Sequence, residues 1–424
     1  MNKEQERKAK LGRRRLACLA FALSMSFAAC GFSLFGPKHE DAPPRRSDTA
    51  SPSASPFRDR GPRPGTRSRV MEIKIGAVLP LSGVVASDGE AAMHGLQIAE
   101  ADINAAGDMP FRVRIIPSDG KFEPRESLNA FNLLLSQKVV GMLLIGDNTC
   151  QMTKMQVAKQ EIPTIASMVV TERSLKGNRW MFRCWPPIAT SAKIMARHMR
   201  MSGKTVRAAI FHIDAMYGLE SAKGFTDEFK ASGGQVVATE SFPFLASDLR
   251  PQIAKLLQTH PEGLYVTGFG QGLITAINQL REAGWKETIY TDTAVVDPRV
   301  KKNLASLDKI VFVGNAFDEE RAKGGAAADF AAKYRKLSKS ETDEVPPQAP
   351  FAYMAARILV HGLAAARGSK PAVTASISDL RDFPSVLGPI SYNSEREIVL
   401  PLYVKTFGPD GRNVLIDDKL WTKP

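Results

Sequence analysis

Short apolar runs alternate with amphipathic stretches over residues 73–291 of the chain. The apolar runs contain four to seven residues, many of them β-branched, as buried strands do. The stretches between them repeat apolar residues every three or four positions, which is the period of a helix. In residues 89–106, for example, one helical face carries Ala92, Leu96 and Ile103. The alternation predicts parallel sheets that are covered by helices on both faces.

The same alternation occurs on either side of Pro186 and Pro187. Before the two prolines, it predicts strands at residues 73–79, 111–116, 139–145 and 162–166, and helices at residues 89–106, 124–137 and 154–160. After them, it predicts strands at residues 207–212, 235–240, 263–267 and 288–291, and helices at residues 189–201, 217–232, 248–259 and 273–283. We therefore predict an α/β protein with two doubly wound parallel-sheet lobes. Ligands of such sheets bind beyond the carboxyl ends of the strands. The loops to search for function are residues 79–89, 146–150, 166–171, 212–217, 267–272 and 291–295.

The first 70 residues lack this pattern. Arg13–Arg15 precede an apolar run, Leu16–Ala29, which has the length of a secretory signal peptide and is short for a membrane span. Small residues directly before Cys30 resemble a bacterial lipoprotein cleavage site, which implies a signal peptide over residues 1–30 and a lipid on Cys30. An ordinary signal peptide with an incidental cysteine is the alternative. Residues 31–70 are rich in Pro, Ser, Arg and Gly and predict a flexible tether.

Composition and charge fit an exported globular protein. The 424 residues are 44% hydrophobic, enough for two lobes with buried cores. The formal net charge is +13, but residues 1–70 hold 15 Lys and Arg against 6 Asp and Glu. Nine of the thirteen charges thus belong to the leader and tether, and the remainder is close to neutral. Because nucleic-acid binding needs basic residues on a folded face, we expect no nucleic-acid partner.

No arrangement of residues in the sequence predicts catalysis. The six histidines lack metal-ligand spacing, and neither a Gly-x-Ser-x-Gly motif nor a His-Glu-x-x-His motif occurs. Gly268–Gly272 follows a strand and opens a helix, as a dinucleotide loop does, but its third glycine comes one residue early. We therefore expect no enzyme activity, no cofactor and no metal.

Several motifs carry a family resemblance. The chain reads Ile75-Gly-Ala-Val-Leu-Pro-Leu-Ser-Gly83 and continues with Gly89, Gly95 and Ala101-Asp-Ile-Asn104. Further landmarks follow in order, namely Gly146, Glu161-Ile-Pro163, Met181-Phe-Arg183, Asp214 with Tyr217-Gly218, and Gly388-Pro-Ile-Ser-Tyr392. From about residue 72 to about residue 415 the chain resembles the branched-chain amino-acid-binding family of periplasmic proteins.

The resemblance implies a type I periplasmic binding fold, in which three crossovers join the two lobes. The crossovers would lie near Trp185–Ile188, Val313–Phe317 and Gly388–Tyr392. The first lobe would then comprise residues 71–187 and 316–389. The second would comprise residues 188–315 and 390–424, with C-terminal strands at Leu400–Phe407 and Val414–Ile416.

The resemblance also implies a function. The chain would be the extracytoplasmic receptor of an ABC-type importer, anchored in the cell envelope by its lipid. It would close on a small polar solute, namely an amino acid or a related carboxylate or amide, and the closed form would engage a membrane permease. The alternative is a ligand sensor or amide-responsive regulator built on the same module.

Nine residues are the candidate ligand contacts. They are Ser82, Asp88, Cys150, Ser167, Val169 and Thr171 in the first lobe, and Tyr217, Phe269 and Asp292 in the second. Cys150 stands where amino-acid-binding members carry a hydroxyl residue that holds the ligand carboxylate, and Asp292 lies near the family's amine-binding acid. Structural roles are the alternatives: a turn cap for Ser82, helix packing for Tyr217 and Phe269, and a helix cap for Asp292.

Two cysteines remain in the predicted lobes, Cys150 and Cys184. Both fall on the cleft side of the first lobe, and an oxidising compartment permits them to form a disulfide. Two free, buried thiols are the alternative.

Overall fold

The computed structural model describes residues 71–339, 344–366 and 368–416. The predicted signal peptide, Cys30 and the tether lie outside these ranges. Within them, no helix combines the length and the apolar character that crossing a membrane requires.

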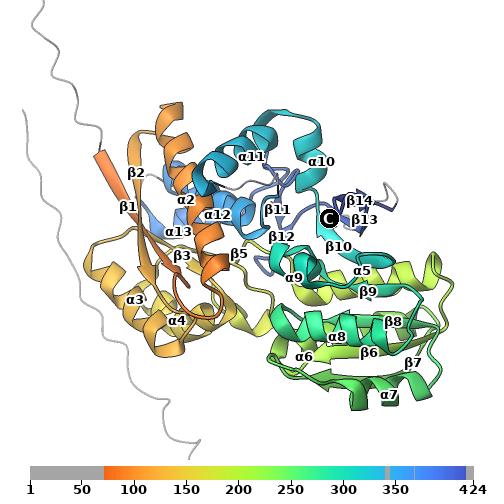
Figure 1. The fold of residues 1–424 in the computed structure, drawn as a ribbon. Helices are drawn as coiled ribbons and strands as arrows, with labels where there is room; N and C mark the ends of the chain where they lie inside the picture. Colours follow the sequence, from red (N-terminus) through yellow and green to blue (C-terminus); the bar gives the residue numbers. More distant parts are fainter. Residues whose placement is uncertain (1–70, 340–343, 367, 417–424) are drawn as a thin grey trace, which may run out of the picture. The chain divides into compact units, whose positions relative to one another are not determined.

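The first lobe is built on a five-stranded parallel sheet of order β2-β1-β3-β4-β5 (Figure 1). Its strands are β1 (Met71–Leu79), β2 (Phe111–Asp119), β3 (Gly141–Ile145), β4 (Thr164–Ser167) and β5 (Met181–Arg183). Its helices are α2 (Ala86–Ala106), α3 (Pro124–Ser136), α4 (Asp147–Gln160), the 3₁₀ turn η1 (Glu172–Ser174), α10 (Phe317–Ala322), α11 (Gly325–Ser338), α12 (Gln348–Ala365) and α13 (Lys370–Ser378). In Figure 1 the blue α12 lies beside the orange α2, although more than 240 residues separate them along the chain.

Alternation along β1 divides the core of this lobe. Ile75, Ala77 and Leu79 belong to the core that α2 and α12 cover, whereas Val78 belongs to the core that α3 and α4 cover. Successive side chains along a strand point to opposite faces of the sheet, so the single apolar run of β1 contributes side chains to both cores. A run without polar interruption, as in β3, is therefore expected of a strand buried on both faces.

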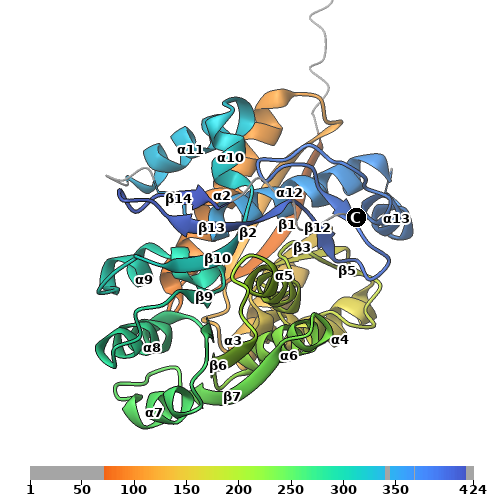
Figure 2. The same cartoon turned by 90° about the vertical axis from the view of Figure 1, so that its right-hand side faces the viewer.

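The second lobe is built on a seven-stranded sheet of order β14-β13-β10-β9-β8-β6-β7 (Figure 2). Its strands are β6 (Arg207–Ile213), β7 (Gln235–Phe242), β8 (Gly263–Thr267), β9 (Ile289–Thr291), β10 (Ile310–Asn315), β13 (Leu402–Phe407) and β14 (Asn413–Leu415). Its helices are α5 (Ile188–Met201), α6 (Met216–Ala231), α7 (Arg250–Gln258), α8 (Gly270–Glu282), the 3₁₀ turn η2 (Thr293–Val296) and α9 (Pro298–Asn303). Strands β6 to β10 are parallel, and β13 and β14 are antiparallel to their neighbours.

Three chain segments connect the lobes. The chain passes from β5 to α5 and from β10 to α10, and it returns a third time before β13. On the third passage, β11 (Ser391–Tyr392) pairs with β12 (Ile398–Val399). The backbone of Glu397 forms an isolated parallel β-bridge with that of Arg183 in β5. The third crossover therefore lies after Val399 and not near Gly388–Tyr392. The glycine-proline turn there begins a hairpin that stays along the first sheet.

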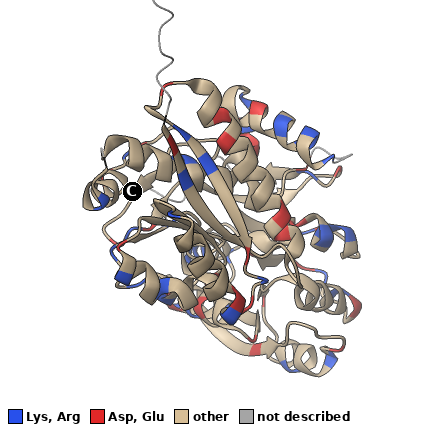
Figure 3. Ribbon diagram, turned by 90° about the vertical axis from the view of Figure 1, so that its left-hand side faces the viewer, with Lys and Arg blue, Asp and Glu red and all other residues tan. Residues whose placement is uncertain are grey.

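The starts of three predicted helices and one strand also differ from expectation. Helix α2 begins at Ala86, three residues before the predicted start. Helix α4 begins at Asp147 and not at Lys154, because Gly146 has a φ of 100° and turns the chain directly from β3 into the helix. Helix α8 begins at Gly270, three residues before the predicted start. Strand β10 was expected only as a crossover, yet it pairs with β9 in the middle of the second sheet. Charged residues of both signs are interspersed over the described helices (Figure 3).

Candidate ligand-binding site

The nine predicted ligand residues lie at or just beyond the carboxyl ends of the strands. In the first lobe they follow β1 (Ser82 and Asp88), β3 (Cys150) and β4 (Val169 and Thr171), or end β4 itself (Ser167). In the second lobe they follow β6 (Tyr217), β8 (Phe269) and β9 (Asp292). This is the edge at which parallel α/β sheets bind ligands. Their assignment as ligand contacts stays a prediction.

Asp147, which the sequence did not single out, organises the first-lobe side of this edge. It is the first residue of α4, and its carboxylate accepts hydrogen bonds from the backbone N–H groups of Val170 (3.1 Å) and Thr171 (3.2 Å). The hydroxyls of Thr171 and Ser174 donate to the same carboxylate, each at 2.6 Å. Asp147 thus receives four donors from the loop after β4.

Arg183 holds the other side of the same loop. Its side chain is 1% exposed, and its guanidinium donates to the carbonyl oxygens of Val169 and Thr171. Its Nε lies 3.5 Å from the Glu397 carboxylate. Arg183 thus binds carbonyl oxygens of the loop after β4, and Asp147 binds amide groups of the same loop, so the two side chains together fix its conformation. In the sequence, Arg183 stands out only as part of the Met181-Phe-Arg183 landmark, and its charge at the end of an apolar strand is the signal that marks it.

Cys150 and Cys184 do not form a disulfide. Both are free and fully buried. Cys150 packs in the core under α3 and α4, whereas Cys184 lies in the opposite core, with its Sγ 3.6 Å from the Phe351 carbonyl oxygen of α12. The alternative of two free thiols is therefore correct, because the sheet separates the two side chains.

Neither thiol should react in the folded protein. Burial raises the pKa of Cys150 and of Cys184 well above that of a free thiol, and only the thiolate is reactive. We expect Ellman's reagent to label neither cysteine under native conditions. In denaturant without reductant, both should react at once. If the two thiols of the denatured protein reacted only after a reductant was added, Cys150 and Cys184 would be joined in a disulfide and not free.

Asp292 stands in a network of buried hydroxyls in the second lobe. It is 1% exposed, and its Oδ2 accepts a hydrogen bond from Thr267 Oγ1 at 2.6 Å. Its Oδ1 accepts from Ala294 N at 2.9 Å and so caps η2, as the alternative interpretation held. Burial is the main influence and raises the pKa of Asp292 to about 6. The neighbouring Tyr217 side chain and Gly268 backbone act to lower its pKa.

The raised pKa of Asp292 predicts a pH dependence of stability. Because the folded pKa of about 6 exceeds the ordinary value of 3.8, its contribution is fully present below pH 3.8 and is lost as the pH rises through 6. The loss should approach about 3 kcal/mol, since each pKa unit corresponds to about 1.4 kcal/mol. Urea unfolding between pH 4 and 7.5 should show less pH dependence in Asp292→Asn than in the parent. If the free energy of unfolding changed with pH in the same way in both proteins, the pKa of Asp292 would not be raised.

Aromatic rings line the second-lobe side beside Asp292. The rings of Tyr217 and Phe269 meet edge to face, with centroids 5.3 Å apart, and Phe244 lies 5.4 Å from Phe269. Tyr217 is the second residue of α6, and Phe269 directly precedes α8. An aromatic surface next to a carboxylate can contact an apolar solute face or a cation.

Two contacts bridge the lobes close to these residues. Asp88 accepts a hydrogen bond from Arg299 Nη2 of α9, in the second lobe, at 2.7 Å. It accepts another from Gln348 Nε2 of α12, in its own lobe, at 3.2 Å. The backbone N–H of Glu172 in η1 donates to Glu220 Oε2 of α6 at 2.8 Å. Asp88 thus joins the lobes in this structure. Burial, opposed by Arg299, raises its pKa to about 6.

The hydroxyl of Ser82 is also engaged within its lobe. It donates to Asp119 Oδ2 at 2.6 Å, and the other oxygen of Asp119 accepts from the amides of Leu81 (2.9 Å) and Lys121 (2.8 Å). Asp119 thereby fixes the loop after β1. Ser167 differs, because its buried Oγ has no hydrogen-bond partner among the described residues.

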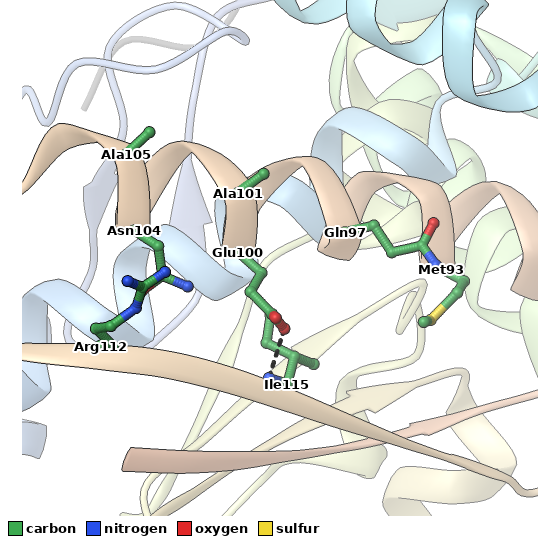
Figure 4. Close-up of a pocket in the computed structure, with 8 residues that line it drawn as sticks. All are labelled: Met93, Gln97, Glu100, Ala101, Asn104, Ala105, Arg112 and Ile115. Carbon is green, nitrogen blue, oxygen red and sulfur yellow. Dashed lines mark hydrogen bonds between the residues drawn. The ribbon is translucent and has the colours of Figure 1, made fainter. Parts of the chain in front are cut away.

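A groove of about 580 Å³ lies elsewhere, between α2 and the edge strand β2 (Figure 4). Glu100 accepts a hydrogen bond from Ile115 N at 2.7 Å, and Asn104 both accepts from Val113 N and donates to Val113 O at 2.8 Å. These side chains satisfy edge-strand groups that would otherwise be open to another strand. The side chains in this groove cover the edge of the first sheet, and the groove is separate from the carboxyl ends of the strands where the predicted ligand residues lie.

Two facing lobes, with polar groups and aromatic rings at their strand ends, define a solute-binding protein. The model of a family described as periplasmic binding protein matches residues 72–407, and the chain belongs to this family. The type I periplasmic binding fold predicted from the sequence is thereby confirmed. The family and the fold are those of substrate-binding proteins and not of enzymes.

Individual relatives are distant. A Leu/Ile/Val-binding protein homolog 8 of Brucella abortus is 23% identical over 51% of this chain and 56% of that protein. The chain thus spans about half the length of the first curated relatives it matches. The structure of the leucine-binding protein LivK of Thermotoga maritima covers 81% of this chain at 17% identity, with 98% of its own length matched and a TM-score of 0.72. A solute-binding protein of R. palustris, solved with benzoate, covers 83% at 19% identity, with all of its length matched and a TM-score of 0.69.

Proposed function

We propose that this protein is the extracytoplasmic receptor of an ABC-type importer and closes on a small polar solute between its lobes. The carrying observation is that polar strand-end groups of both lobes act on each other. Asp88 of the first lobe accepts a hydrogen bond from Arg299 of the second at 2.7 Å, and the backbone N–H of Glu172 in the first lobe donates to Glu220 of the second at 2.8 Å. A solute between them would contact both lobes at once.

Closure would follow from this double contact. A solute that touches one lobe in the open form and both in the closed form favours the closed form by the difference in binding free energy. The Asp88–Arg299 and Glu172–Glu220 bridges would form in the same movement. A permease would then recognise the closed receptor.

The solute classes to test are those expected from the sequence and those named for similar proteins. A panel of amino acids, amides, carboxylates, aromatic acids and amines would be screened by thermal shift. A solute at about 100 times its Kd adds about 2.7 kcal/mol of stability. Small-angle scattering should report a smaller radius of gyration with the same solute. Tyr217→Ala should lose both responses, and a panel without any stabilising solute would contradict the receptor function.

The envelope location rests on the N-terminal segments. We propose that Cys30 carries the lipid and that residues 31–70 tether the lobes to the membrane. Mass spectrometry of the N-terminal peptide should find the lipid, and Cys30→Ser should release the protein from the membrane fraction. Unlipidated, membrane-free parent protein would contradict the anchor.

The sensor or amide-responsive regulator remains the second proposal, because the binding module serves both roles. Uptake of the stabilising solute by cells without the gene distinguishes the two. Lost uptake supports the importer, whereas unchanged uptake with a lost transcriptional response supports the sensor.

A further inference from the structure

The donors that would receive a solute carboxylate in the first lobe are already occupied. A carboxylate is held by N–H and O–H groups. The loop after β4 offers four of them, the amides of Val170 and Thr171 and the hydroxyls of Thr171 and Ser174. All four point at Asp147, at 2.6–3.2 Å. The side chain of Asp147 is thus bound as a solute carboxylate would be.

The cation beside this loop is also occupied. The guanidinium of Arg183 donates to the carbonyl oxygens of Val169 and Thr171 and pairs with Glu397, and it is buried. Cys150, at the position expected to hold a hydroxyl, is a weak donor. The Ser167 hydroxyl is buried without a partner in the described part of the chain, so this wall offers a second carboxylate that hydroxyl and not the four donors that Asp147 holds.

The second-lobe side of the predicted cleft also carries carboxyl groups, those of Glu220 and Asp292. Glu220 of α6 accepts a hydrogen bond at 2.8 Å from the backbone N–H of Glu172, the residue directly after Thr171. Asp292 is buried beside Tyr217 and accepts a hydrogen bond from Thr267 Oγ1. Glu220 lies three residues after Tyr217 on the same side of α6, so it and Asp292, two carboxyl groups of the second lobe, flank the aromatic rings. A positively charged solute would offset their mutual repulsion, and the Tyr217 and Phe269 rings suit contact with an ammonium group.

We infer that Asp147 takes the place of a solute carboxylate, so that the cleft selects a positively charged amine without a free carboxylate. The inference rests on the proposed receptor function and narrows its solute class. Amino acids and benzoate, which carry a free carboxylate, would compete with Asp147 for the same four donors.

The occupancy of the donors can be tested without knowing the solute. In Asp147→Gly the four donors become vacant, and formate should refill them. We expect formate to raise the Tm of this variant by several degrees relative to chloride at equal ionic strength. The parent and Asp214→Gly, which removes an exposed carboxylate from the loop after β6, should not respond. A folded Asp147→Gly variant without a formate response would overturn the inference.

The solute class is tested on the full-length parent protein by titration calorimetry, which needs no variant. Putrescine and tetramethylammonium are the amine probes, and leucine and benzoate are the carboxylate probes. We expect an amine to bind at least tenfold more tightly than either carboxylate. Tighter binding of leucine or benzoate would overturn the inference and leave the receptor function intact. Absence of amine binding would also overturn it, whereas the receptor function fails only if the whole solute panel does.

Discussion

Replacing Arg183 by methionine should destabilise the folded protein by about 3–5 kcal/mol, the largest loss we expect from a single side chain. The methionine keeps much of the volume but leaves the carbonyl oxygens of Val169 and Thr171 and the Glu397 carboxylate without their cation. Breaking a buried ion pair costs about this much. Here Arg183 is buried, Glu397 is partly buried, and two buried carbonyl oxygens also lose their donor. Urea unfolding at pH 7 measures the change.

Arg179→Met is the matched control for this substitution. Arg179 precedes the same strand, but its side chain is 68% exposed and pairs with Glu161 at the surface. Exposed pairs contribute about 0–1 kcal/mol, so the control should stay within about 1 kcal/mol of the parent. If Arg183→Met were as stable as Arg179→Met, the guanidinium would not be fixing the loop after β4.

The contrast between these arginines shows what the sequence could and could not predict. Periodicity identified β1, α2 and most other elements, because each depends on apolar positions within a single segment. The partners of Arg183 lie 12 and 14 residues earlier and in the distant hairpin of Glu397. Local patterns carry no record of such contacts. The same holds for Asp147, whose four donors follow a different strand.

The errors in the fold have the same cause. The run Ile310–Asn315 is as apolar as other strands, but the family resemblance assigned its end to a crossover, and its pairing with β9 was not foreseen. The turn at Gly388 signals a change of direction but not its destination. The β-bridge between Glu397 and Arg183 and the contact of the Tyr392 and Phe182 rings show that the chain stays along the first sheet. A turn motif therefore located the hairpin without locating the third crossover.

Gly218→Ala should be the most damaging change at the second-lobe wall. A Cβ at this position would lie 2.0 Å from the Ile213 carbonyl oxygen and 2.9 Å from His212 Nδ1. The obstacle at 2.0 Å is backbone and cannot rotate away, so α6 must shift away from the end of β6. Overpacking of this kind costs about 1–3 kcal/mol or more.

The shift should affect the site as well as stability, because Tyr217 is the neighbouring residue and its ring packs edge to face on Phe269 beside Asp292. Displacing it separates the aromatic wall from the carboxylate, so we expect at least a tenfold weaker affinity for whichever solute stabilises the parent, alongside a lower Tm. Lys223→Ala, on the exposed face of the same helix, is the control and should change neither by much. If Gly218→Ala lowered the Tm but left the affinity unchanged, the close approach of α6 to β6 would support the fold alone, and Tyr217 would not be a solute contact.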